Sequence, residues 1–135
     1  MFYDLANDLP LFIVMAMKEV TQKNSTFWFE QQTGDHGPMD YKWLTTDMRY
    51  DAYTNFVFGA VGKAVGFTEG QLLRVAGWVQ QQGKYAYLGE GKAPPNRFAA
   101  YAGVGGEGAF GDKPQDQIQI KNGISYYDCR KQQDR

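Results

Sequence analysis

Hydrophobic positions recur at helical spacing along much of the chain, beginning with an apolar stretch at residues 9–20. Asp8 can accept a hydrogen bond from an unpaired backbone N–H, so we expect a helix from Asp8 to about Lys23. Its inward face would carry Ile13, Met17 and Val20. The stretch is too short to span a bilayer and lacks the basic start and cleavage site of a signal peptide, which favours a buried helix.

A second helix is predicted at residues 25–34, which read STFWFEQQTG. Asn24 or Ser25 could cap its start, and Gly34 could end it. Three consecutive aromatic residues would also fit a strand, but a helix is our preferred interpretation.

The central segment combines a helical pattern with glycines at positions 59, 62 and 66. Each glycine inside a helix costs about 1 kcal/mol relative to alanine. We therefore expect these glycines to form a smooth face that lets another helix approach closely, with a bound ligand as the alternative.

The clearest helix is at residues 68–83, with Thr68 as N-cap, Gln71 at the capping-box position and Gly83 at the end. Its predicted core stripe is Leu72, Leu73, Val75, Ala76 and Val79.

A glycine-rich loop is predicted at residues 83–111, with a short strand at residues 84–89 as an option. A last helix follows. Asp112 is its predicted N-cap, Pro114 lies in its first turn, and the negative charge of Asp116 interacts favourably with the positive N-terminal end of the helix dipole. Its inward residues would be Ile120, Ile124 and Tyr127.

These elements predict a mainly α fold of about five helices with a long glycine-rich loop and room for a small β-hairpin; an α+β fold is the alternative. The chain has 135 residues, of which 43% are hydrophobic and 21% charged. A chain of this size can bury roughly two thirds of its unfolded surface in one core, so we expect residues 1–135 to form a single domain.

Net charge and the scarcity of cysteine and histidine limit the kinds of site that this chain can form. Fourteen basic and fifteen acidic residues give a net charge of -1, so the general basic excess of nucleic-acid-binding proteins is missing, although a local patch could replace it. Cys129 and His36 are the only cysteine and histidine, which excludes an internal disulfide and clusters of several histidines or cysteines around a metal. We expect no metal and no cofactor.

Carboxylates are then the best candidates for acid and base catalysis, because burial can keep one carboxyl protonated while a second stays ionised. Asp40 and Asp51 lie among aromatic residues and are the first pair to consider. Lys42 could stabilise negative charge and Asn55 could hold a water or a substrate hydroxyl. A turn or cap acceptor and a surface lysine are the plainer interpretations of the same residues.

Aromatic side chains could supply flat surfaces for sugar rings or bases, although core packing is their commoner use. The candidates are Trp28, Tyr41, Trp43 and Phe56.

Residues 26–42 (TFWFEQQTGDHGPMDYK) and 50–81 (YDAYTNFVFGAVGKAVGFTEGQLLRVAGWVQQ) resemble the bacterial toxin 44 family of polymorphic toxins. A late GDxPxDQ segment at residues 111–117 extends the resemblance, which covers about residues 25–127. Met39 departs from the family pattern, which has tryptophan there, and Thr54 and Phe58 replace a glycine and a tyrosine.

The resemblance implies a toxin domain at the C-terminal end of a larger secreted protein with Rhs-type repeats or a type VI secretion adaptor. It also implies delivery into a target cell and a cognate immunity protein as partner. Asp40, Tyr41, Lys42 and Asn55 lie on positions of the family pattern, which ranks Asp40 and Lys42 above Asp51.

Our leading hypothesis is an antibacterial effector that hydrolyses a target-cell polymer, with peptidoglycan glycan strands favoured and the periplasm as its site of action. Asp40 would act as general acid, and Asp51 or Asp116 as base or nucleophile. The predicted catalytic residues are Asp40, Lys42, Asp51 and Asn55; the predicted substrate-binding residues are Trp28, Tyr41, Phe56 and Asp116.

Two other functions remain open. One is a cytoplasmic nuclease that needs no metal, binds phosphates through Lys42, Arg49, Lys63 and Arg74, and uses His36 or a carboxylate as base. The other is a non-enzymatic toxin that acts on membranes or blocks a target protein through residues 9–20.

Overall fold

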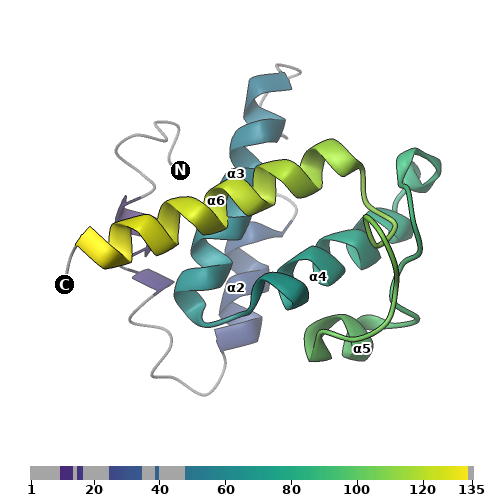
Figure 1. Cartoon of the computed structure of the whole chain (residues 1–135), viewed down its shortest axis with the longest axis horizontal. Coiled ribbons are helices and arrows are strands. Elements are labelled where there is room, and N and C mark those ends of the chain that lie inside the picture. The colour runs from purple at the N-terminus through teal and green to yellow at the C-terminus, as the bar shows by residue number, and fades with distance from the viewer. Residues whose placement is uncertain (1–9, 14, 17–24, 35–38, 40–47, 134–135) are drawn as a thin grey trace.

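The computed structural model describes residues 10–13, 15–16, 25–34, 39 and 48–133, and this part of the chain is mainly helical. Figure 1 shows the elements, which are α2 (Ser25–Thr33), α3 (Met48–Val65), α4 (Glu69–Gln82), the 3-10 helix η2 (Ala86–Leu88), α5 (Arg97–Ala102) and α6 (Pro114–Gln133). Within the described residues there is no strand, only an isolated antiparallel bridge between Lys92 and Glu107. The predicted mainly α class is confirmed.

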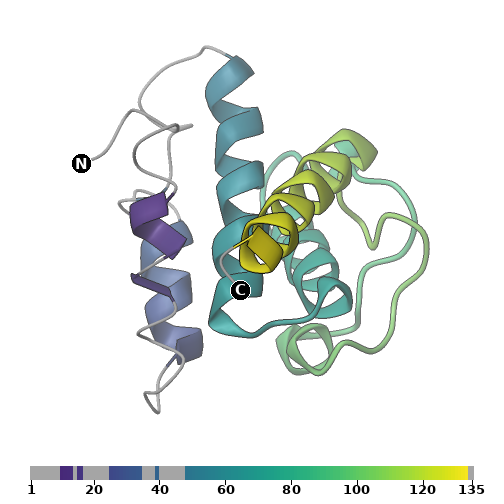
Figure 2. The ribbon, with the colours of Figure 1, turned by 60° about the vertical axis from the view of Figure 1, so that its left-hand side comes forward.

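Helix α3 lies in the middle of the molecule. Figure 2 shows α2 and the helical residues 10–13 and 15–16 on one side of α3, and α4, α5 and α6 on the other. One apolar core joins both sides. Its most deeply buried large side chains are Phe12, Phe29, Met39, Val57, Val61, Leu72 and Ile120.

The most extensive packing joins α3 to α6, which cross in Figure 1. Glycines allow the contact on both helices: a Cβ on Gly59 would lie 2.1 Å from the carbonyl oxygen of Ile120, and a Cβ on Gly123 would lie 1.9 Å from that of Phe56. No side chain fits at such distances, so the two backbones touch directly. The predicted use of the central glycines in close helix packing is confirmed for Gly59.

Gly62 also allows close packing with neighbouring helices, whereas Gly66 does not. Gly62 faces the side chains of Leu72 and Phe29, which a Cβ would meet at 2.3 Å and 3.1 Å. Gly66 has a φ of 113°, which side-chain-bearing residues rarely adopt, and it follows the last residue of α3. It therefore ends the helix rather than packing against a neighbour.

Helix α4 has the predicted ends, because Thr68 and Gln71 form a capping box and Gly83 is the C-cap. Leu72, Leu73 and Val75 are buried. Val79 was wrongly predicted to be in the core, since it is 56% exposed. It lies on the same face as Val75, but it lines the cleft at the end of α4.

The glycine-rich region is more ordered than the sequence predicted. The stretch at residues 84–89 contains η2 in place of the suggested strand, and α5 occupies residues that we had assigned to a loop. Asp112 lies two residues before α6 begins at Pro114, so it does not occupy the predicted cap position. Ile120, Ile124 and Tyr127 are buried as predicted.

At the start of the chain, the described residues 10–13 and 15–16 are helical, and Phe12, Ile13 and Ala16 are buried. The predicted start at Asp8 and the positions of Met17 and Val20 lie outside the described residues.

None of the helices that the structure describes has both the length and the apolar character needed to cross a membrane.

Candidate active-site cleft

A cleft of about 740 Å³ lies where α2, α3, α4, α5 and the start of α6 converge. Phe29, Phe58 and Val75 form part of its apolar lining. Its polar and charged lining includes Glu30, Asn55, Lys84, Arg97, Asp112 and Asp116. Convergent polar groups on an apolar lining are typical of binding and catalytic sites.

Asp112 is the most deeply buried charged residue of this lining, with 3% of its surface exposed. Its Oδ1 accepts a hydrogen bond from the backbone N–H of Lys113 at 2.9 Å, and its Oδ2 accepts one from Gln117 Nε2 at 2.8 Å. Burial disfavours the charged form and raises the pKa of Asp112 to about 6, although both hydrogen bonds oppose the shift. This carboxyl can therefore hold a proton near neutral pH.

The backbone that carries Asp112 is held in an unusual conformation. Phe110 has a φ of 57° and Gly111 a φ of 86°. The carbonyl of Phe110 packs so close to Gly77 that a Cβ there would lie 2.0 Å away, and the guanidinium of Arg74 stacks on the Phe110 ring at 4.5 Å. A positive φ at phenylalanine is costly and persists only where surrounding contacts enforce it. These contacts place Asp112 at the cleft.

Asp116 lies one turn further along, in the first turn of α6, where the sequence predicted that its charge would suit the helix dipole. Its side chain is 19% exposed and lies 3.6 Å from Lys113 Nζ. The charge of Asp116 also contributes to the raised pKa of Asp112. The cleft thus holds two carboxyls in unlike environments, one buried and one partly open to solvent.

Asn55 is the predicted catalytic residue that the structure places in the cleft. It lies on α3, and its Nδ2 donates a hydrogen bond to Gln119 Oε1 on α6 at 2.8 Å. The amide is thus oriented by a neighbour on the same helix as Asp116. Such a group can bind a substrate hydroxyl through its remaining donor and acceptor positions.

The opposite wall of the cleft is held by a contact between α2 and α5. Glu30 accepts hydrogen bonds from the Arg97 guanidinium and from the Tyr101 hydroxyl. Burial and the hydrogen bond to Glu30 raise the pKa of Tyr101. Tyr101 also packs against Phe67, with ring centroids 5.7 Å apart, so this wall is tied to the segment between α3 and α4.

Several predicted site residues cannot be compared with this geometry. Asp40, Tyr41 and Lys42 lie outside the described residues, and so do His36 and Trp43. Asp51 lies in the first turn of α3, and its side chain is outside the description. Their roles stay predictions.

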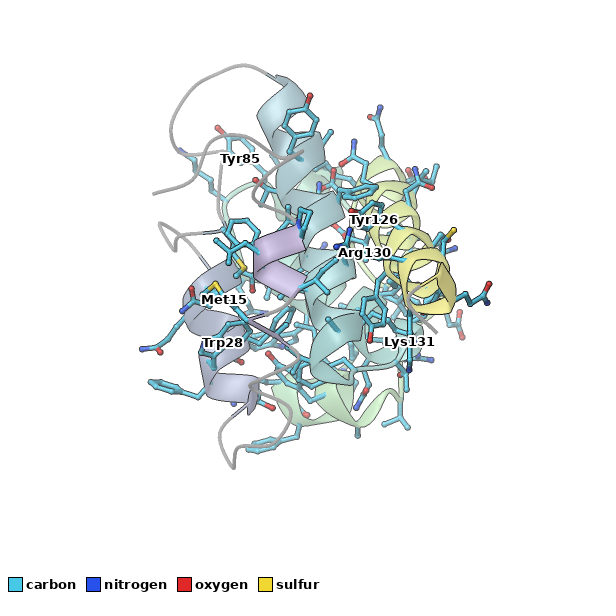
Figure 3. All side chains as sticks on the ribbon, turned by 90° about the vertical axis from the view of Figure 1, so that its left-hand side faces the viewer. Met15, Trp28, Tyr85, Tyr126, Arg130 and Lys131 are labelled. Atoms are coloured by element: carbon cyan, nitrogen blue, oxygen red, sulfur yellow. The ribbon has the colours of Figure 1, made fainter. Side chains whose placement is uncertain are left out.

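Trp28 and Phe56, the other two predicted substrate-binding aromatics, are partly buried and pack against the core. Phe56 lies beside Tyr126 of α6, with ring centroids 5.6 Å apart. Neither belongs to the described residues that line the cleft. Figure 3 shows Trp28 on α2 near Met15, well separated from Tyr85 at the cleft.

Arg74, a proposed phosphate ligand in the nuclease hypothesis, is used within the fold. Besides stacking on Phe110, it donates hydrogen bonds to the carbonyls of Gly105 and Gly70 at 2.9 Å and 3.1 Å. Lys63 is partly buried on α3.

Among the residues that the structure describes, no group of three or more His, Cys, Asp or Glu side chains could hold a metal ion.

Sequence reasoning missed Asp112 as a site residue and treated it as a helix cap. A signal was present, because Asp112 and Asp116 stand four residues apart in the GDxPxDQ segment. Burial of Asp112 depends on contacts with α4 and with the backbone of residues 89–90, which are distant in sequence. That burial could not be predicted from local spacing.

Comparison with known proteins identifies one family. The family model described as bacterial toxin 44 matches residues 16–129, which include α2 to α5 and most of α6. The chain matches no curated protein and no solved structure.

Proposed function

Because the chain belongs to the bacterial toxin 44 family, we propose that it is an antibacterial effector domain that hydrolyses glycosidic bonds, with peptidoglycan glycan strands of the target cell as substrate. The observation that carries this proposal is the pairing of Asp112, buried and with a pKa of about 6, with the more accessible Asp116 at one cleft. Most glycoside hydrolases use two carboxyls with such divided roles.

In the proposed reaction, Asp112 is the general acid. It donates its proton to the glycosidic oxygen as the bond between that oxygen and the anomeric carbon breaks. Asp116 is the second carboxylate, which activates the attacking water or attacks the anomeric carbon itself. Water supplies the hydroxyl of the new reducing end. If Asp116 activates the water, it takes the water's proton and later releases it to solvent, while Asp112 regains a proton from solvent; if Asp116 has attacked, water breaks the glycosyl–Asp116 ester and its proton returns to Asp112.

Charge favours a glycan over a nucleic acid. Asp112, Asp116 and Glu30 all line the cleft, whereas Arg97 on the same lining is paired with Glu30. A polyphosphate backbone would meet these three acidic residues, and Lys84, the other basic residue among the described lining residues, would supply a single positive charge against them. A largely neutral sugar polymer avoids this repulsion.

Family membership supports the biological setting of the proposal. The domain would form the C-terminal part of a larger secreted protein that carries it into the periplasm of a rival cell. A cognate immunity protein would protect the producer. Asp40, which the sequence favoured as general acid, is the alternative to Asp112 in that role.

The test is expression in Escherichia coli with and without a periplasmic signal, followed by analysis of muropeptides released from purified sacculi. We expect killing only with the signal, new reducing sugar ends, and loss of both in Asp112→Asn. Asp128→Asn, an exposed aspartate on α6 that is not among the cleft-lining residues, is the matched control. Killing from cytoplasmic expression with intact sacculi would contradict the proposal and make nucleic acid the next substrate to test.

A further inference from the structure

Two tyrosines beside the cleft are unusually exposed. Tyr85 and Tyr87 have 53% and 76% of their surface open to solvent. Their ring centroids are 6.4 Å apart and the rings are inclined by 53°. Tyr85 lines the cleft, so the pair extends the cleft lining outward onto the surface. We call Tyr85 and Tyr87 the tyrosine pair.

The backbone beneath the tyrosine pair is firmly held. Gln80 Nε2 donates to the carbonyl of Tyr85 at 2.7 Å, and Gln81 Nε2 donates to the carbonyl of Ala86 at 2.9 Å. The backbone N–H of Leu88 also donates to the Tyr85 carbonyl, at 3.0 Å. A backbone held in this way loses little conformational entropy when a ligand binds to the rings that it carries.

The same contacts connect the tyrosine pair to Asp112. Gln81 Nε2 donates a second hydrogen bond, to the carbonyl of Gly111 at 2.7 Å. The backbone N–H of Glu90 donates to the carbonyl of Asp112 at 2.9 Å, and that of Gly111 donates to the carbonyl of Glu90 at 2.8 Å. The fold therefore connects the backbone that carries the exposed rings to the backbone that carries the buried carboxyl.

The chemistry of the rings suits a sugar polymer. The C–H groups on the face of a pyranose carry partial positive charge and pack on the negative face of an aromatic ring, while a tyrosine hydroxyl can bond to sugar hydroxyls. Lys84 Nζ lies 5.3 Å from the centre of the Tyr85 ring and adds a donor at the same place. A strand bound here would lead directly into the cleft.

We propose that the tyrosine pair binds sugar rings of the glycan strand and positions the strand for cleavage at Asp112 and Asp116. This inference rests on the proposed function and adds the subsite through which the substrate is held. It also moves the aromatic binding surface from Trp28 and Phe56, which pack against the core, to residues that the sequence assigned to a loop.

The test measures binding without turnover, in an Asp112→Asn background. The probe is peptide-free glycan strands prepared from purified sacculi, and binding is measured by isothermal titration calorimetry. The variants are Tyr85→Ala, Tyr87→Ala and the double variant, with Tyr87→Trp as the conservative replacement. Phe98→Ala is the matched control, because Phe98 is 81% exposed and is not among the residues that line the cleft.

We expect each alanine variant to lose about tenfold in affinity and the double variant to lose more, with Tyr87→Trp and Phe98→Ala close to the parent. Circular dichroism and thermal unfolding check that the double variant is folded. Equal affinity of the double variant and the parent would overturn the inference, as would absence of glycan binding by the parent.

The two proposals can fail separately. If Asp112→Asn retains cleavage and killing, the catalytic assignment fails, but loss of binding in the double variant would still establish the tyrosine pair as a glycan site. If the double variant binds normally while Asp112→Asn is inactive, the proposed function stands and the tyrosine pair does not take part.

Discussion

Gln117 Nε2 donates a hydrogen bond to Asp112 Oδ2 at 2.8 Å and lies 3.2 Å from the carbonyl oxygen of Leu73, which also accepts from it. One amide thus joins the start of α6 to α4 and holds the buried carboxyl in place. Because this hydrogen bond favours the carboxylate while burial favours the neutral acid, the proton affinity of Asp112 depends on a balance of contacts that mutation can change.

The first prediction concerns catalysis by Asp112. Asp112→Asn should lower the rate of glycan cleavage by at least about 100-fold, because asparagine cannot donate the required proton. The wild-type rate should fall as the pH rises above about 6, where Asp112 loses its proton. Reducing-end release from sacculi between pH 4 and pH 8 measures both effects. A wild-type rate that rises steadily to pH 8 would argue against Asp112 as the acid.

The second prediction concerns stability. The pKa of Asp112 is raised in the folded state from 3.8 to about 6, so the folded protein binds the proton more tightly than the unfolded chain. Its contribution is fully present below pH 3.8 and is lost as the pH rises through 6. Between pH 4 and pH 7.5, the free energy of unfolding of the wild type should therefore fall by about 2 kcal/mol relative to Asp112→Asn. Urea unfolding of both proteins at the two pH values tests this, and parallel pH dependences would refute it.

The third prediction tests whether Gln117 sets the pKa of Asp112 or only supports the fold. Gln117→Met removes the donor to Asp112 Oδ2 with little change in volume. The pKa of Asp112 should rise further, which shifts the alkaline limb of the cleavage profile to higher pH. Gln132→Met, at an exposed position near the end of α6, should leave the profile unchanged. If Gln117→Met lowers the cleavage rate without shifting the alkaline limb of the pH profile, Gln117 has a purely structural role.

The fourth prediction tests the contact between α3 and α6. Gly59→Ala and Gly123→Ala should each destabilise the protein by about 2 kcal/mol or more, since the added methyl group meets a backbone carbonyl. Gly83→Ala is the control, because the nearest atom to its Cβ would be 3.8 Å away and its φ is -94°. Thermal unfolding compares the three variants. Unchanged stability in Gly59→Ala would mean that the helices can separate at no cost.

The fifth prediction compares the two donors to Glu30. The Arg97 side chain is 45% exposed, so Arg97→Ala should lower the free energy of unfolding by less than about 1 kcal/mol. Tyr101→Phe removes a hydrogen bond from a partly buried hydroxyl and should cost about 1 kcal/mol or somewhat more. Urea unfolding at neutral pH ranks the two variants. A larger loss of unfolding free energy in Arg97→Ala than in Tyr101→Phe would show that the Arg97 contact is the more stabilising one.

Local signals predicted several elements well. The capping box of Thr68 and Gln71 and the C-cap at Gly83 depend only on neighbouring residues, so α4 could be delimited from sequence. The inward face of α6 followed from spacing. Val79 and residues 84–89 were misjudged because their environment is set by distant elements, which leave Val79 at an open cleft and hold η2 through Gln80 and Gln81.

By itself, the sequence determined the helical class, the family and the presence of carboxylates and aromatics as the chemically useful groups. These properties follow from periodicity, capping and motif, which act over a few residues. Only the tertiary structure decided which carboxyl is buried and which aromatics are exposed. Asp112 acquires its raised pKa, and Tyr85 and Tyr87 their place at the cleft, from packing and hydrogen bonds among α4, η2 and the turn before α6. The burial of Asp112 and the exposure of the two tyrosines depend on contacts between residues that are distant in sequence, and local residue order does not encode these contacts.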